Sequence, residues 1–216
     1  MTTETVGNEA GTLPARSVSY GRFAGVCAIL AGTSGLLYAI SFVVLRNVLL
    51  SALFLMLGGL LTSAILLAVY ERLRETDASF ALLALVLGLA GSLGSAAHGG
   101  YDLANAINPP SSLTVLPNPV DPRGLLTFGA AGLALLIVAW LIGRGGTFPR
   151  GLGYLGYLSA VLLLALYLGR LIVLDATSPL IVAPALLSGF VVNPLFYCWL
   201  GLSLLRKRPK SERRAA

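Results

Sequence analysis

The sequence predicts an all-α, polytopic membrane protein, a bundle of six transmembrane helices. Only 11% of its 216 residues are charged, whereas 56% are hydrophobic, and the mean hydropathy is +0.86. Soluble domains carry about 25% charged residues because water must solvate their surface. The composition therefore excludes a soluble enzyme, a secreted disulfide scaffold and a nucleic-acid-binding domain, although a net charge of +6 would otherwise suggest nucleic acid.

The helices are predicted from uncharged runs that are long enough to cross a bilayer. A helix needs about 20 apolar residues to span about 30 Å of hydrocarbon. Six runs qualify: between Arg22 and Arg46, between Arg46 and Glu71, between Asp77 and Asp102, between Arg123 and Arg144, from Arg150 to Leu174, and from Ala176 to Leu205. No run has a polar stripe, which excludes amphipathic surface helices. We expect a disordered cytoplasmic tail at 1–22, the bundle at 23–205 and a basic cytoplasmic tail at 206–216.

The basic residues predict the orientation. With both termini in the cytoplasm, twelve Lys and Arg lie inside and three, Arg46, Arg123 and Arg170, lie outside. This asymmetry follows the positive-inside rule, and we expect a multi-pass protein of the inner membrane. The C-terminal tail is expected either to anchor this topology or to contact anionic lipid headgroups. Its basic residues are Arg206, Lys207, Arg208, Lys210, Arg213 and Arg214.

The outer connection at about 102–123 is the longest between the predicted helices. It contains five prolines, so it cannot be regular helix throughout. Its first residues, from Asp102 to Asn108, can prolong the third helix by about two turns until Pro109 and Pro110 end it.

The third run is rich in small residues at helical spacing, chiefly Gly88, Gly91, Ser92 and Ser95. Small residues let helices approach closely in lipid, where van der Waals packing replaces the hydrophobic drive. We therefore expect this helix to be central in the bundle, and packing alone is the simplest interpretation of these four residues.

A polar cluster is predicted at the outer end of the bundle. Arg170 lies about one turn below the outer boundary, where it can snorkel, form a structural ion pair or bind a ligand. Its candidate partners are His98, Tyr101, Asp102 and Asp175. Because His98 and Asp102 are four residues apart on a helix, they share a face. The hypothesis is a pocket under the outer loop in which Arg170 reaches Asp102 and His98.

The sixth run is predicted to be interrupted at Asn193 and Pro194. A proline has no N–H, so the carbonyl of Phe190 loses its helical partner at about mid-membrane. The interruption is either an ordinary kink or the kind of local unwinding that builds binding sites in transporters.

Enzymatic chemistry is not indicated. The chain has one histidine, and its two cysteines, Cys27 and Cys198, lie in apolar runs without metal-binding spacing. We therefore expect no metal, no cofactor and no catalytic residue.

Three short segments carry a resemblance: Arg22-Phe23-Ala24-Gly25, Tyr70-Glu71-Arg72-Leu73 and Phe148-Pro149-Arg150-Gly151-Leu152-Gly153. In these the chain resembles an uncharacterised bacterial family of multi-pass inner-membrane proteins, known only as a domain of unknown function. The resemblance implies a bacterial inner-membrane location and a helical bundle, and it supplies no catalytic residue.

Two functions remain open on the sequence. One is a small permease or transporter-like protein, and the other is a non-transporting protein that binds lipid or a protein partner. Homo-oligomers are compatible with both, and nucleic acid is not an expected partner. A cavity reaching Asn193 would favour the first function, and a solid core would favour the second.

Overall fold

The computed structural model describes residues 18–109, 124–173 and 178–206. These residues form helices and no strands, and six of the helices are long and apolar enough to cross a membrane. The predicted fold class is therefore confirmed. Most of the two predicted tails and of the proline-rich outer loop lies outside the described residues.

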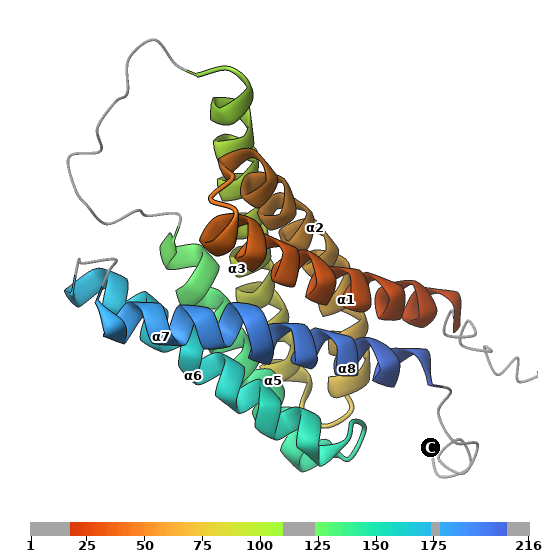
Figure 1. Ribbon diagram of the computed structural model, residues 1–216. Helices are drawn as coiled ribbons and strands as arrows, with labels where there is room; N and C mark the ends of the chain where they lie inside the picture. Colours follow the sequence, from red (N-terminus) through yellow and green to blue (C-terminus); the bar gives the residue numbers. More distant parts are fainter. Residues whose placement is uncertain (1–17, 110–123, 174–177, 207–216) are drawn as a thin grey trace, which may run out of the picture.

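Three of the six spans contain a π-helical segment (Figure 1). The elements are α1 (Val18–Ala39) with η1 (Ile40–Val44), α2 (Val48–Leu73), α3 (Ala78–Ile107), η2 (Leu125–Ala130) with α5 (Ala131–Gly145), α6 (Arg150–Ile172), and α7 (Pro179–Leu187) with η3 (Ser188–Val192) and α8 (Asn193–Leu205).

The helix ends follow local sequence signals. The Asn47 side chain caps α2 by accepting from the Leu50 N–H at 3.0 Å, and Asp77 caps α3 in the same way. Gly146, with φ of 66°, ends α5 in the left-handed conformation that suits glycine. As predicted, α3 continues past Asp102 and ends at Ile107, before the prolines.

The predicted start of the bundle was wrong by several residues. Helix α1 begins at Val18, inside the stretch assigned to a disordered tail. The Tyr20 hydroxyl donates to the Ala64 carbonyl of α2 at 2.8 Å, and this contact ties the first turn of α1 to the bundle.

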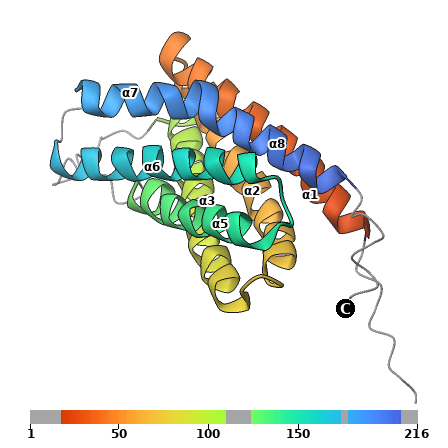
Figure 2. The ribbon, with the colours of Figure 1, turned by 90° about the horizontal axis from the view of Figure 1, so that it is seen from below.

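The helices form a bundle in which α3 is flanked by α2 and α5. Helix α1 runs beside α8 and α2, while α6 packs on α5 and α7. In Figures 1 and 2 α3 crosses α6, α7 and α8 at a steep angle, and in Figure 1 the last turns of α3 project past their neighbours.

Glycines bring α3 into near backbone contact with its neighbours. A Cβ atom added at Gly59 of α2 would lie 2.5 Å from the Ser92 carbonyl oxygen, and one added at Gly91 would lie 2.8 Å from the Ala131 backbone nitrogen. The Ser63 and Ser92 hydroxyls also form a hydrogen bond of 3.0 Å between α2 and α3. Gly88, Gly91 and Ser92 are buried, and Ser95 is half-buried.

The main hydrophobic core occupies one half of the spans. Its largest fully buried side chains include Phe196, Ile65, Leu73, Leu141 and Leu152. Each belongs to the half of its span that the positive-inside rule assigns to the cytoplasm. The half of the bundle that holds this core is therefore closely packed.

Candidate functional site

A cavity of about 170 Å³ lies at the centre of the bundle. Residues of α1, α2, α3, α5, α6 and α8 line it, and on each helix they fall near the middle of the span. The cavity is therefore at mid-membrane depth. Its polar lining consists of Tyr38, Thr62, Ser92, Ser95, Asn193 and Tyr197.

Two glycines provide the open space. A Cβ atom added at Gly35 of α1 would meet no heavy atom within 4 Å, and one added at Gly58 of α2 would meet only the Ser34 Cβ atom at 4.0 Å. Both residues line the cavity. They differ from Gly59 and Gly91, whose missing side chains are replaced by a neighbouring helix.

Asn193 reaches the cavity from an interrupted helix. The π-helical segment η3 ends at Val192, and the N–H of Asn193, the next residue, donates to the Ser188 carbonyl. The interruption predicted at Asn193 and Pro194 is thus present as a widened turn, a feature that is frequent at functional sites.

The Asn193 amide is held in place on both sides. The Ser159 hydroxyl of α6 donates to Oδ1, and Nδ2 donates to the Ser188 Oγ atom at 2.9 Å. Both serines are buried. Because both ends of the half-buried amide have a hydrogen-bond partner, these bonds hold the side chain at the cavity wall.

Hydroxyl groups on α3 face the cavity as acceptors. The Ser95 hydroxyl donates to the Gly91 carbonyl at 3.2 Å, and the Ser92 hydroxyl donates to the Leu89 carbonyl or shares its proton with Ser63. A hydroxyl whose proton is used in this way keeps lone pairs on its oxygen. Among the described residues that line the cavity there is no Asp, Glu, Lys, Arg or His.

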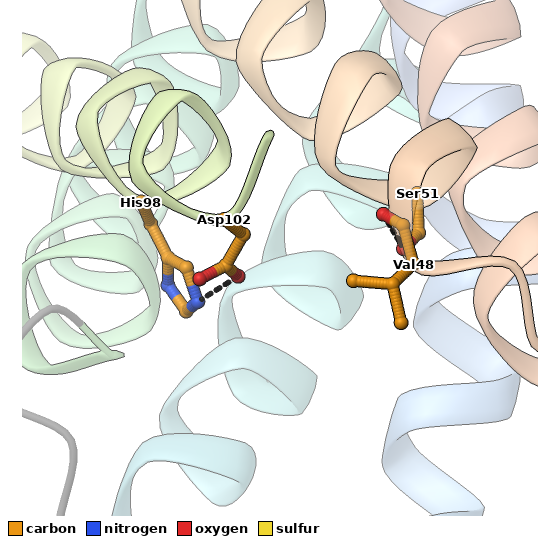
Figure 3. Close-up of polar contacts among 4 residues, drawn as sticks. All are labelled: Val48, Ser51, His98 and Asp102. Carbon is orange, nitrogen blue, oxygen red and sulfur yellow. Dashed lines mark hydrogen bonds and ion pairs between the residues drawn. The ribbon is translucent and has the colours of Figure 1, made fainter. Parts of the chain in front are cut away.

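The predicted pair on α3 forms. His98 Nε2 lies 3.0 Å from Asp102 Oδ2, one helical turn apart, and Figure 3 shows the pair beside the first turn of α2, where the Ser51 hydroxyl donates to the Val48 carbonyl. Asp102 also borders a shallow outer depression, whereas Tyr101 on the same helix is 58% exposed.

The structure does not bring Arg170 to this pair. Its exposed guanidinium lies over the Phe128 ring, with Cζ 5.8 Å from the centroid, and in the described part of the chain it forms no ion pair with Asp102 or His98. Segment η2 packs against both α3 and α6 and separates them. Asp175, the other predicted partner, lies outside the described residues.

Sequence reasoning missed the role of Arg72. Its guanidinium donates to the Ser203 and Leu204 carbonyls at 3.0 and 2.9 Å and lies over the Phe148 ring. It thereby satisfies two of the last carbonyls of α8 and links the end of α2 to the end of α8. The sequence marks Arg72 only as an interfacial charge, because the neighbouring helix end is 131 residues away.

Comparisons with family models, curated proteins and solved structures found no match to this chain. Across residues 18–109, 124–173 and 178–206, no group of three or more His, Cys, Asp or Glu side chains lies close enough together to hold a metal ion. The central cavity is the feature on which a function can be argued.

Proposed function

We propose that the protein is a small permease-like protein of a bacterial inner membrane that admits a small molecule to its central cavity. One observation supports the proposal: Asn193, which follows the π-helical segment of the sixth span, lines this cavity. Transporters bind their substrates near the midplane, on discontinuous helices that line a cavity. Asn193 supplies the fixed polar group that such a site requires.

The lining of the cavity supports the presence of water or a ligand in it. The space measures about 170 Å³, and six polar side chains border it. A space of this size with several polar partners can hold water, whereas an apolar cavity stays dry.

Access from the outer side fits the arrangement best. The hydrophobic core and Arg72 lie in the inner half of the bundle, whereas Tyr38, which lines the cavity, lies in the outer half of the first span. With both termini in the cytoplasm, as the basic residues favour, the cavity faces away from the cytoplasm. The tail that begins at Arg206 would then lie against anionic headgroups of the cytoplasmic leaflet.

Cysteine reactivity tests whether the cavity is wet. In a background with Cys27→Ala and Cys198→Ala, Ser95→Cys should react with methyl methanethiosulfonate, because the reacting thiolate forms only where water reaches. Leu93→Cys, on the exposed face of α3, and Ala84→Cys, buried on the same helix outside the cavity, should stay unreactive. If Ser95→Cys is as inert as these two controls, the cavity is dry and the non-transporting alternative is favoured.

A further inference from the structure

We infer that the ligand of the central cavity is an uncharged molecule of about the size of phenol, with an apolar body and one hydroxyl group. The inference rests on the proposed function, since it presupposes that the cavity admits a ligand. Three properties of the cavity carry it: volume, absence of charge, and the hydrogen-bonding state of the polar lining.

The volume limits the ligand to a small ring or a short chain. The cavity measures about 170 Å³, and an engineered protein cavity of about 150 Å³ holds one benzene molecule. A ligand of roughly seven non-hydrogen atoms therefore fills the space, and a disaccharide, a nucleotide or a lipid does not enter it. Phe54, Leu135, Val138 and Leu163 provide apolar walls for its body.

The lining discriminates against charge. The described residues of the cavity wall include no acidic or basic side chain. Ionised groups at the centre of a bilayer are strongly disfavoured unless a partner of opposite charge is present. The pair His98–Asp102 lies on the projecting outer part of α3 and does not line the cavity. An ion or a zwitterion would therefore lose its hydration without compensation.

The polar lining favours a ligand hydroxyl. The Ser95 hydroxyl donates to the Gly91 carbonyl, and the Ser92 hydroxyl bonds to the Leu89 carbonyl or to Ser63, so both oxygens keep lone pairs that can accept. Ser159 and Ser188 fix the Asn193 amide, which keeps a second Nδ2 proton that can donate to a ligand oxygen. A ligand hydroxyl can form both kinds of bond, and a purely apolar ligand of the same shape can form neither.

Thermal unfolding of the purified full-length protein in detergent tests the inference with four probes. Phenol and toluene have the same shape and differ in the hydroxyl group, while benzoate and benzylammonium carry opposite charges. Phenol at about ten times its Kd should raise the unfolding temperature by about 3–6 °C. Toluene should have a smaller effect, and the two ions should have none.

Variants in which a side chain fills the cavity show whether phenol acts by binding in the cavity or by dissolving in the detergent. Gly58→Leu and Gly35→Leu place a side chain in the open space, whereas Gly143→Leu adds the same side chain at an exposed position of α5 with no atom within 4 Å. The phenol effect should persist in Gly143→Leu and vanish in the filled variants. Two filled variants are used so that the test survives a folding defect in one of them.

The outcomes distinguish this inference from the proposed function. If benzoate or benzylammonium matches phenol and its effect disappears in the filled variants, the cavity is the site but the ligand class is wrong. If toluene matches phenol, the hydroxyl requirement is overturned. If no probe separates the wild type from the filled variants, both the ligand class and the cavity as a binding site are refuted.

Discussion

Gly58 and Gly59 are adjacent on α2, and the structure predicts different effects when each is replaced by alanine. At Gly58 a new methyl group enters the cavity and meets only the Ser34 Cβ atom at 4.0 Å. At Gly59 it would lie 2.5 Å from the Ser92 carbonyl oxygen and 2.6 Å from the Ala96 backbone nitrogen. These neighbours are backbone atoms, so they cannot rotate away.

The magnitudes follow from these contacts. Both replacements gain up to about 1 kcal/mol in helix propensity, and this gain cancels when the two variants are compared. Gly59→Ala must push α2 and α3 apart, which costs about 1–3 kcal/mol as overpacking. It also stretches the Ser63–Ser92 hydrogen bond, worth about 0.6 kcal/mol in a membrane protein. We expect Gly59→Ala to be less stable than Gly58→Ala by about 2–3 kcal/mol.

Reversible unfolding in mixed detergent and dodecyl sulfate micelles, followed by far-ultraviolet circular dichroism, measures both free energies against the wild type. The expected order of stability is Gly58→Ala at or above the wild type, then Gly59→Ala. A difference below about 0.5 kcal/mol, within the range of an ordinary surface substitution, would refute the close approach of α2 and α3 and with it the distinction between packing and cavity glycines.

Three further predictions concern the charged residues and the topology. Arg72→Ala should destabilise the protein by about 2–3 kcal/mol, since two charge-assisted bonds to α8 carbonyls are lost; chemical unfolding measures this, and a silent variant would contradict it. Arg170→Lys should change the unfolding free energy by less than about 0.5 kcal/mol, because the exposed guanidinium has no ion pair in the described part of the chain; a larger loss would reveal a bidentate partner. Reporter fusions should read inside, outside, inside and inside, and a periplasmic C-terminus would refute the orientation. The fusion points are Arg74, Asn118, Gly146 and Ala216.

The number and limits of the helices could be predicted because lipid permits few alternatives. A run of apolar residues between charges must be helical across hydrocarbon, and the charges themselves fall at the ends. The start of α1 was misplaced because Val18 to Arg22 is polar enough to be solvated. In the structure the hydrogen bond from Tyr20 to Ala64 holds these residues against α2. A contact between residues so far apart in the sequence cannot be predicted from the local sequence.

The candidate site was predictable only in part. Asn193 and the interruption of the sixth span follow from covalent chemistry, since a proline lacks the N–H group. The neighbours of each helix do not follow from sequence, and this is why Arg170 was expected beside Asp102 although η2 separates α6 from α3. The cavity could not be predicted for the same reason: residues of six helices line it, and the sequence does not show which helices are neighbours.

Small residues in this bundle have two physical roles that sequence spacing cannot separate. Gly59 and Gly91 allow close approach, and a neighbouring backbone occupies the place of their missing side chains. Gly35 and Gly58 gain no such contact, yet each costs about 1 kcal/mol in helix propensity relative to alanine. Packing does not account for this cost. The cavity gives a reason for glycine at these two positions, since any side chain there would enter the space that Asn193 lines.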